Sequence, residues 1–193
     1  MVMALDSLQD VGDDALMVLY ANGDQTAAQS LALRHSARMM GLAYRMLNDQ
    51  TEAEDIAQEA LMRLWKIAPD WRQGEAKVST WLYRVVSNMC TDRLRRKRGA
   101  ALDDIPEPED DAPSAEETLQ QQARFSKLHT ALNALPERQK LAVSLRHIDE
   151  LSNPEIADVM EISVEAVESL TSRGRRALAK ILAAEKDQLG YTT

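Results

Sequence analysis

The segment from residue 99 to 117 divides the chain and limits the fold to a small unit on either side. Eight acidic residues and no basic residue occur between Asp103 and Glu117, among several prolines. A segment with so little apolar content cannot form a core of its own. We therefore predict two small helical domains, residues 1–98 and 118–193, each with a modest core, joined by an acidic flexible linker at residues 99–117.

The linker also accounts for the whole net charge of -8. Acidic and basic residues balance in residues 1–99, with 13 of each, and in residues 118–193, with 10 of each. An acidic chain as a whole therefore still permits nucleic-acid binding by either domain. The chain has no apolar run of membrane-spanning length and no signal-peptide pattern, so we expect a cytoplasmic protein without membrane insertion.

Apolar residues recur at spacings of three and four along both halves, which predicts an all-α fold. The chain has only one Phe and seven Gly residues, which also favours helices over strands. Breaks at Asn22–Asp24, Asn48–Thr51 and Pro69 divide the first domain into three or four helices. The second domain is predicted to hold about four.

The second domain contains the pattern of a helix-turn-helix. Ser152 followed by Glu155 is a capping box, and Ser163 begins a second helix after a turn of roughly three residues. Arginine can donate two bonds to a guanine edge, serine can bond a base or a phosphate, and glutamate can accept from a cytosine amino group. The outward side of the second helix carries residues of these types, namely Glu165, Ser169, Ser172, Arg173 and Arg176.

The helix predicted from Val78 to Arg98 carries a row of side chains suited to melted DNA. Aromatic rings stack on unpaired bases, and cations hold the backbone. The row consists of Trp81, Arg84, Asn88 and Arg95, with Tyr83 and Ser87 at its border, and the loop before it adds Trp71, Arg72, Gln73 and Lys77. Taken alone, Trp81 and Tyr83 could equally complete the core.

Two segments carry a resemblance to a known family. TEAEDIAQEALMRLWKIAPDW and VSTWLYRVVSNMCTDRLRRKR resemble the second conserved region of the extracytoplasmic-function (ECF) sigma factors, the compact branch of the bacterial sigma-70 family. The helix-turn-helix resembles the fourth region of that family. The resemblance runs from about Asp13 to Ala183 and implies an alternative sigma factor that binds core RNA polymerase, recognises two promoter elements and assists promoter melting.

The resemblance also assigns roles to residues. It implies that a polar face docks on the clamp of the largest polymerase subunit, formed by Asp55, Gln58, Glu59 and Arg63, a face that periodicity alone would call solvated. It assigns the -10 element to Trp71, Arg72, Gln73, Lys77, Trp81, Arg84, Asn88, Arg95 and Arg96. It assigns the -35 element to the outward side of the second helix of the helix-turn-helix, which we call the reader helix. The linker would thread into the polymerase cleft, and further partners would be promoter DNA, the flap of the second-largest subunit and an anti-sigma factor.

The chain departs from the family pattern in two places. Relatives usually have a glycine in the turn, where this chain has Met160 and Glu161, and a basic residue where it has Glu168. These departures affect the transfer of base contacts, and hence the promoter sequence, rather than the domain assignment.

Two other functions remain open at this point: a free-standing helix-turn-helix repressor that binds a palindrome as a dimer, and a sigma-like decoy that binds an anti-sigma protein. We expect no enzyme activity, metal or cofactor, since His35, His129 and His147 are far apart and no phosphate-binding loop occurs. The single cysteine, Cys90, rules out an intramolecular disulfide and is expected to be a small buried hydrophobe.

Overall fold

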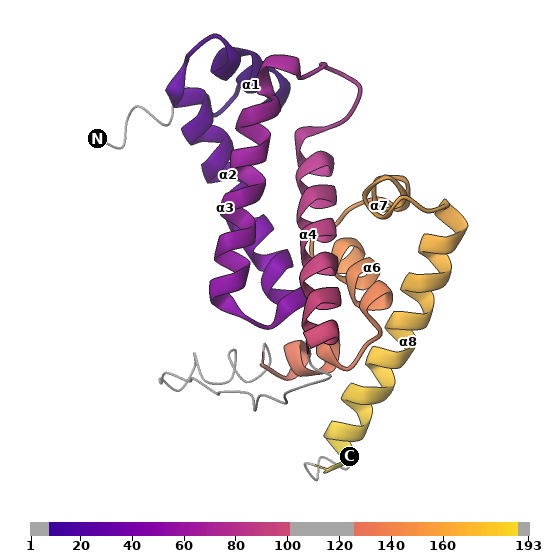
Figure 1. Cartoon of the computed structure of the whole chain (residues 1–193). Helices are drawn as coiled ribbons and strands as arrows, with labels where there is room; N and C mark the ends of the chain where they lie inside the picture. The colour runs from indigo at the N-terminus through magenta and orange to yellow at the C-terminus, as the bar shows by residue number, and fades with distance from the viewer. Residues whose placement is uncertain (1–7, 101–125, 189–193) are drawn as a thin grey trace.

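The computed structural model describes residues 8–100 and 126–188, and all regular secondary structure within these ranges is helical, which confirms the all-α prediction (Figure 1). Residues 126–133 are helical, and the other elements are α1 (Asp13–Ala21), α2 (Gln25–Leu47), α3 (Gln50–Ile67), the short 3-10 helix η2 (Ala68–Asp70), α4 (Val78–Ala100), α6 (Glu137–His147), α7 (Asn153–Met160) and α8 (Val164–Gln188).

Acidic side chains start two helices of the first half, α2 and α3, where the sequence predicts breaks. Asp24 Oδ1 accepts a hydrogen bond of 2.9 Å from the backbone N–H of Thr26 at the start of α2. Asp49 Oδ1 likewise accepts one of 2.9 Å from Glu52 at the start of α3. These side chains satisfy backbone donors that have no partner inside the helix. Pro69 lies in η2, which ends α3 as predicted.

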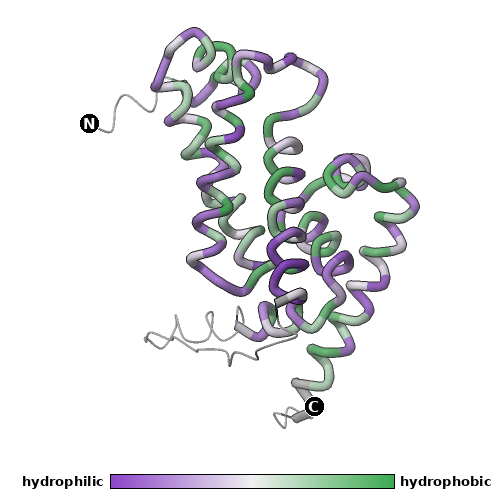
Figure 2. The backbone as a smooth tube through the Cα atoms, in the orientation of Figure 1, coloured by the Kyte–Doolittle hydropathy of each residue, from purple (hydrophilic) through white to green (hydrophobic). Residues whose placement is uncertain are grey.

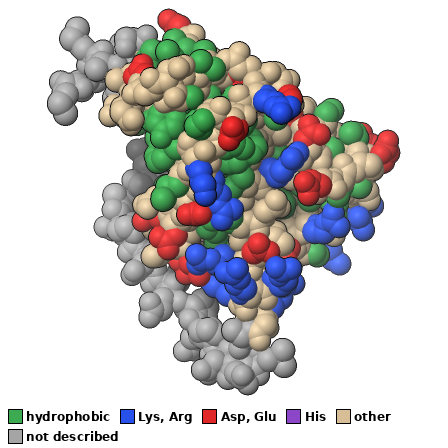
Figure 3. Space-filling view, turned by 45° about the horizontal axis from the view of Figure 1, so that its top comes forward, with side chains coloured by type: hydrophobic (Ala, Val, Ile, Leu, Met, Phe, Trp, Pro, Cys, Tyr) green, Lys and Arg blue, Asp and Glu red, His purple; other side chains and the backbone are tan. Residues whose placement is uncertain are grey.

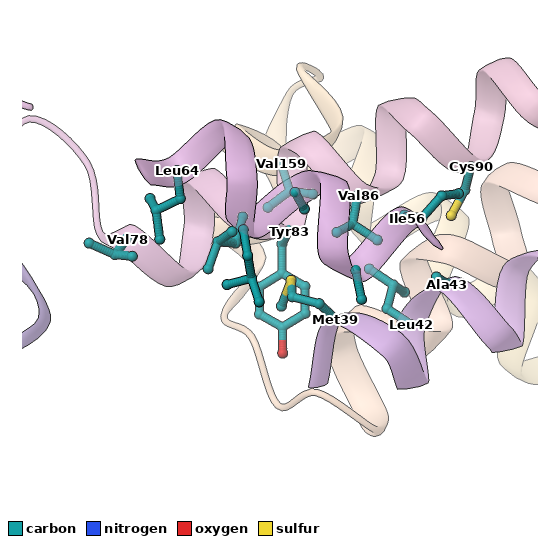
Figure 4. Close-up of a cluster of buried hydrophobic side chains, with 14 of the residues drawn as sticks. Met39, Leu42, Ala43, Ile56, Leu64, Val78, Tyr83, Val86, Cys90 and Val159 are labelled. Carbon is teal, nitrogen blue, oxygen red and sulfur yellow. The ribbon is translucent and has the colours of Figure 1, made fainter. Parts of the chain in front are cut away.

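Helices α2, α3 and α4 pack side by side, and α1 lies across one end of them (Figure 1). Green and purple segments alternate along these helices in Figure 2, and the buried apolar residues of all three belong to one cluster. Cys90 is fully buried on the inner side of α4, as predicted. Figure 4 shows the centre of this core, with Met39 and Leu42 from α2, Ile56 and Leu64 from α3, and Val78, Tyr83, Val86 and Cys90 from α4.

The predicted helix-turn-helix is present as α7 and α8. Ser152 and Glu155 form the capping box: Ser152 Oγ accepts from the N–H of Glu155, and Glu155 Oε2 accepts from the N–H of Ser152 at 2.9 Å. Ser163 Oγ accepts from the N–H of Ala166 at 3.2 Å and so caps α8. Both caps are local, which explains why the sequence pattern located the two helix starts.

The two halves of the chain share one core, where the sequence predicts a separate modest core for each. Leu145, Ile156, Val159 and Val167 of the second half belong to the same buried cluster as the residues of α2, α3 and α4. A smaller cluster lies between α6, α8 and residues 126–135. Apolar periodicity marks which side of a helix is buried but not which helix buries it, so this arrangement could not be read from the pattern.

The predicted linker falls largely outside the described residues. Helix α4 runs to Ala100, so the first two residues of the predicted linker are helical. The rest of it, residues 101–117, lies in the part of the chain that the structure does not describe.

Gly174 marks the crossing of α6 and α8. A Cβ atom there would lie 2.6 Å from Val143 Cγ2 and 3.3 Å from the backbone oxygen of Gln139. We predict that Gly174→Ala lowers the free energy of unfolding by about 1 kcal/mol or more, because overpacking costs about 1–3 kcal/mol and outweighs the helix propensity of about 1 kcal/mol gained. Urea denaturation measures the change. Gly99→Ala, in a helix with open space around it, is the control and should not destabilise the chain.

Glu161 ends α7 in the left-handed conformation, with φ of 53°. This is the turn position where relatives usually carry glycine. We predict that Glu161→Gly raises the free energy of unfolding by about 1 kcal/mol, because a residue with a Cβ is strained there. Glu161→Ala removes the same carboxylate but keeps the strain. If Ala stabilised the chain as much as Gly in urea denaturation, charge rather than strain would be the cause.

Candidate nucleic-acid interface

Helix α3 presents the polar face that the resemblance assigns to polymerase. Asp55, Gln58 and Arg63 are exposed, and Glu59 is half-buried. Arg63 Nε donates to Glu59 Oε1 at 2.9 Å, a pair one helical turn apart. Surface pairs of this kind contribute little to stability. The carboxylate and amide groups on this face are therefore available to a partner.

Met62 lies in the middle of the same face with 59% of its surface exposed, and sequence reasoning assigned it no role. It is seven positions after Asp55 and four after Gln58, so helical spacing alone places all three side chains together. An apolar residue surrounded by exposed polar residues was the signal that could have identified it. An exposed methionine can adapt its shape to a partner surface.

Two of the predicted aromatic residues come together at the start of α4. The rings of Trp71 and Trp81 pack edge to face with centroids 6.3 Å apart. Trp71 Nε1 also donates to Asp14 Oδ1 of α1 at 3.0 Å, which fixes the indole on the helical scaffold. Gly74, with φ of 82°, reverses the loop between the two tryptophans. Both indoles are half-buried, so each contributes to packing and still presents part of its surface.

Most of the remaining residues predicted to contact the -10 element are exposed. Arg72 lies 3.4 Å from Glu75, and Arg95 lies 2.9 Å from Asp92, both pairs on the surface. Gln73, Asn88 and Arg96 are also exposed.

The prediction that Tyr83 and Ser87 lie at the border of the exposed row was wrong. Tyr83 and Ser87 are only 2% exposed, because α4 is packed by α2 on one side and by the second half of the chain on another. Burial raises the pKa of the Tyr83 hydroxyl, and the nearby Asp149 carboxylate raises it further. These two residues complete the core, which for Tyr83 was one of the two readings left open above.

Lys77 and Arg84 contact α7 in the second half of the chain. Lys77 Nζ lies 2.7 Å from Glu155 Oε1. Hydrogen bonds from Lys77 and Ser152 lower the pKa of Glu155 to about 2, and the same carboxylate raises the pKa of Lys77. Arg84 donates from Nε and Nη2 to the backbone oxygen of Asp158, at 3.0 and 2.7 Å. Two cations predicted to bind DNA are therefore occupied within the chain.

The reader helix α8 leaves its predicted contact residues exposed. Arg173 and Arg176 each bond the backbone oxygen one turn earlier, at 3.3 and 3.4 Å, so both guanidinium groups keep donors for a ligand. Hydrogen bonds from its own backbone and from Ser163 lower the pKa of Glu165 at the start of the helix. Ser169 and Ser172 are exposed beside them. Lys and Arg side chains gather along the lower part of the face in Figure 3, with acidic side chains among them.

Two further features are absent from the part of the chain that the structure describes. In residues 8–100 and 126–188, no group of His, Cys, Asp and Glu is arranged to hold a metal ion. None of the helices described is long and apolar enough to span a membrane.

Comparison with known proteins identifies both halves. The family model for sigma-70 region 2 matches residues 31–100, and the model for sigma-70 region 4 matches residues 125–178. The ECF RNA polymerase sigma factor SigW of Bacillus subtilis is 34% identical over 180 residues, covering 83% of this chain and 91% of SigW. The RNA polymerase sigma-H factor of Pseudomonas aeruginosa is 30% identical over 181 residues, covering 88% of this chain and 93% of that protein.

Solved structures support the same fold. CnrH in complex with the cytosolic domain of CnrY matches with a TM-score of 0.68 at 24% identity, over 89% of this chain and 97% of that chain. The sigma factor RpoE of Bartonella quintana, in complex with the anti-sigma factor NepR, matches with a TM-score of 0.67 at 21% identity, over 80% of this chain and 96% of that chain. The two family models match in order along the chain, and the similarity covers 91% of SigW and 93% of the sigma-H factor. This chain therefore belongs to the ECF sigma factors of the sigma-70 family.

Proposed function

We propose that three faces of this chain divide the work of promoter-specific transcription initiation. As an ECF sigma factor, the chain is an alternative sigma factor that directs initiation. The observation that carries the proposal is that α3 and α8 present exposed polar faces that nothing else in the described structure uses. A free-standing repressor would need only the second of them.

The α3 face binds the clamp of the largest subunit of core RNA polymerase. Asp55, Gln58 and Glu59 offer carboxylate and amide groups, and Met62 offers an apolar contact at their centre. Interfaces commonly place an apolar anchor inside a polar surround, because the anchor supplies most of the energy and the polar groups fix the register.

The start of α4 and the loop before it bind the -10 element as single-stranded DNA. The Trp71–Trp81 pair supplies rigid aromatic surface on which an extruded base can stack, which repays the cost of unstacking. Arg72, Gln73, Lys77, Arg84, Asn88, Arg95 and Arg96 would hold the backbone and base edges around it.

Helix α8 reads the -35 element in the major groove through Arg173, Arg176 and the polar residues beside them, and the second domain also contacts the flap of the second-largest subunit. The linker, residues 99–117, would lie in the polymerase cleft. We also expect an anti-sigma factor, because a solved relative of the same fold is bound to one. The site of action is the cytoplasm, where the polymerase works.

Reconstitution with core polymerase tests the proposal. We predict that the chain co-elutes with core polymerase and directs specific start sites from a promoter library. Asp55→Ala with Gln58→Ala should weaken core binding about tenfold or more, because truncating both leaves their partners on the polymerase unpaired, at a cost of more than about 1 kcal/mol in all. Size-exclusion chromatography and competition binding measure both outcomes.

Glu54→Ala is the matched control, since Glu54 is exposed on α3 but is not among the predicted polymerase contacts. Circular dichroism should show unchanged helicity in both variants. A chain that fails to co-elute, yet binds an anti-sigma protein, would be a decoy instead.

The reader helix has its own test on the promoters selected in that library. We predict that Arg173→Ala and Arg176→Ala each weaken holoenzyme binding to the -35 element, by about 1–3 kcal/mol for an arginine that contacts a guanine, with relaxed preference at one base pair. Fluorescence anisotropy on single-base variants of the promoter measures both. Lys127→Ala removes one exposed charge that lies outside α8 and should have no such effect. A uniform, salt-dependent loss across all sequences would assign the arginine to phosphate instead.

A further inference from the structure

The loop that leads into α4 is held by the scaffold at its first residue and exposed over the rest of its length. Residues 72–77 are all exposed, whereas Trp71, which follows η2 directly, is partly buried against the core. The backbone N–H of Trp71 donates to the oxygen of Ala68 at 3.2 Å, and Ala68 is buried. Trp71 is therefore the residue through which the helical scaffold can set the geometry of this loop.

Two contacts orient the indole of Trp71. One is its edge-to-face packing on Trp81, with centroids 6.3 Å apart. The other is the hydrogen bond from its Nε1 to Asp14 Oδ1 at 3.0 Å, which joins residues 57 positions apart. Packing by itself permits the ring to turn over about its last torsion angle, which is broad and roughly two-fold. An indole has a single donor on one edge, so the hydrogen bond to Asp14 selects one of the two orientations.

Asp14 lies in the first turn of α1, and its neighbour Asp13 anchors this turn to α2. Arg34 Nη1 lies 2.8 Å from Asp13 Oδ1, and His35 Nε2 lies 2.7 Å from Asp13 Oδ2. Arg34 also donates to three backbone oxygens of the segment before α1, those of Leu8, Gln9 and Val11, at 2.7, 2.9 and 2.7 Å. The backbone that carries Asp14 is therefore fixed before any DNA is bound.

Sequence reasoning assigned Asp14 no role, and the family model for region 2 matches only from residue 31 onward. The N-cap of α1 is Gly12, so Asp14 is not needed to start the helix. A carboxylate in the first turn interacts favourably with the helix dipole, but a side chain turned toward solvent would do this equally well. Helix α1 packs against η2, at the end of the bundle where the loop leads into α4 (Figure 1). The contact with Trp71 is thus the feature of Asp14 that helix formation leaves unexplained.

We propose that Asp14 is a positioning residue for -10 recognition: its carboxylate fixes the indole of Trp71 in the orientation in which the Trp71–Trp81 pair receives the extruded base. This inference rests on the proposed function, which assigns both tryptophans to the -10 element. An aromatic surface that is already ordered loses less conformational freedom on binding than one that must first be ordered. Asp14 acts through Trp71, so it sets the affinity for a base and not the affinity for phosphate.

Binding of a forked promoter by the holoenzyme tests the proposal. The probe is a promoter selected with core polymerase, in which the non-template strand of the -10 element is left single-stranded. Asp14→Ala should weaken binding about fivefold, because stacking on aromatic rings supplies a large share of single-strand affinity. Removal of a negative charge by itself has the opposite sign, since it lowers repulsion of the phosphates. Asp10→Ala removes an exposed carboxylate just before α1 and is the matched control, which should not weaken binding.

Abasic probes separate the positioning of a stacked base from a general effect on the loop. One base at a time is removed along the single-stranded -10 element, and the largest loss for the wild-type chain marks the captured base. On the probe that lacks this base, Asp14→Ala and the wild type should bind equally. Trp71→Phe keeps a ring without the indole donor, so Asp14→Ala should cost nothing further in that background. Asp14→Asn keeps an oxygen that can accept the bond and should restore most of the binding.

The free chain gives a second readout that does not involve DNA. Fluorine NMR of the chain labelled with fluorotryptophan should show a resonance for each of the three tryptophans, and the one missing from Trp71→Phe belongs to Trp71. In Asp14→Ala this resonance should shift or broaden as the ring gains a second orientation, while that of Trp65 stays in place. Asp14→Asn should restore the wild-type spectrum. Circular dichroism and urea denaturation verify that each variant is folded.

Three results would overturn the proposal. Binding of the forked promoter by Asp14→Ala that equals or exceeds that of the wild type would mean that the carboxylate does not assist recognition. An equal loss on the probe that lacks the captured base would reject the positioning of a base. An unchanged Trp71 resonance in Asp14→Ala would mean that the carboxylate does not orient the ring. If Trp71→Ala and Trp81→Ala still weaken binding in any of these cases, the proposed function stands and only the role of Asp14 is lost. If neither substitution weakens binding, the proposed -10 surface itself is wrong.

Discussion

Helix α4 is the element on which the rest of the structure depends, because its sides serve different partners. Val78, Leu82 and Val86 lie in the core with α2 and α3. The side that carries Lys77 and Arg84 meets α7. A helix can bury one stripe and present another, but each stripe accepts one partner at a time. In the described structure α7 takes up this side of α4, whereas the faces of α3 and α8 stay exposed.

Local structure was predictable because its signals lie within a few residues of one another. The capping box joins Ser152 to Glu155, and Asp24 and Asp49 cap helices that start next to them. The exposure of the predicted contacts on α3 and α8 follows equally from helical spacing. The sequence pattern thus located the helix-turn-helix and the two polar faces. The family resemblance supplied the role expected of each face.

Contacts between distant segments were not predictable, because no pattern in a single sequence links them. Arg45 and Asp149 are 104 residues apart, and neither lies in a motif that indicates a partner. Val159 follows the period of a helix with a buried side, which is equally true of a domain that stands alone. A glycine inside a helix is expected to lower the stability of that helix. Only the structure shows that Val143 packs so close to Gly174 that a Cβ atom there would clash. The sequence indicates which side of each helix is buried. Only the tertiary structure shows which other helix packs against that side.

The buried Arg45–Asp149 pair also explains how an interface can be sensitive to substitution and still be reversible. Removing one partner leaves the other charge buried and unpaired, which costs far more than the pair contributes. Separation of the two halves returns both charges to water together, and hydration then offsets most of the lost attraction. The Lys77–Glu155 pair at the edge is exposed enough to contribute little to stability. What holds the two halves together is then mainly the apolar contact around Ile156 and Val159, which is non-directional and scales with the apolar area removed from water.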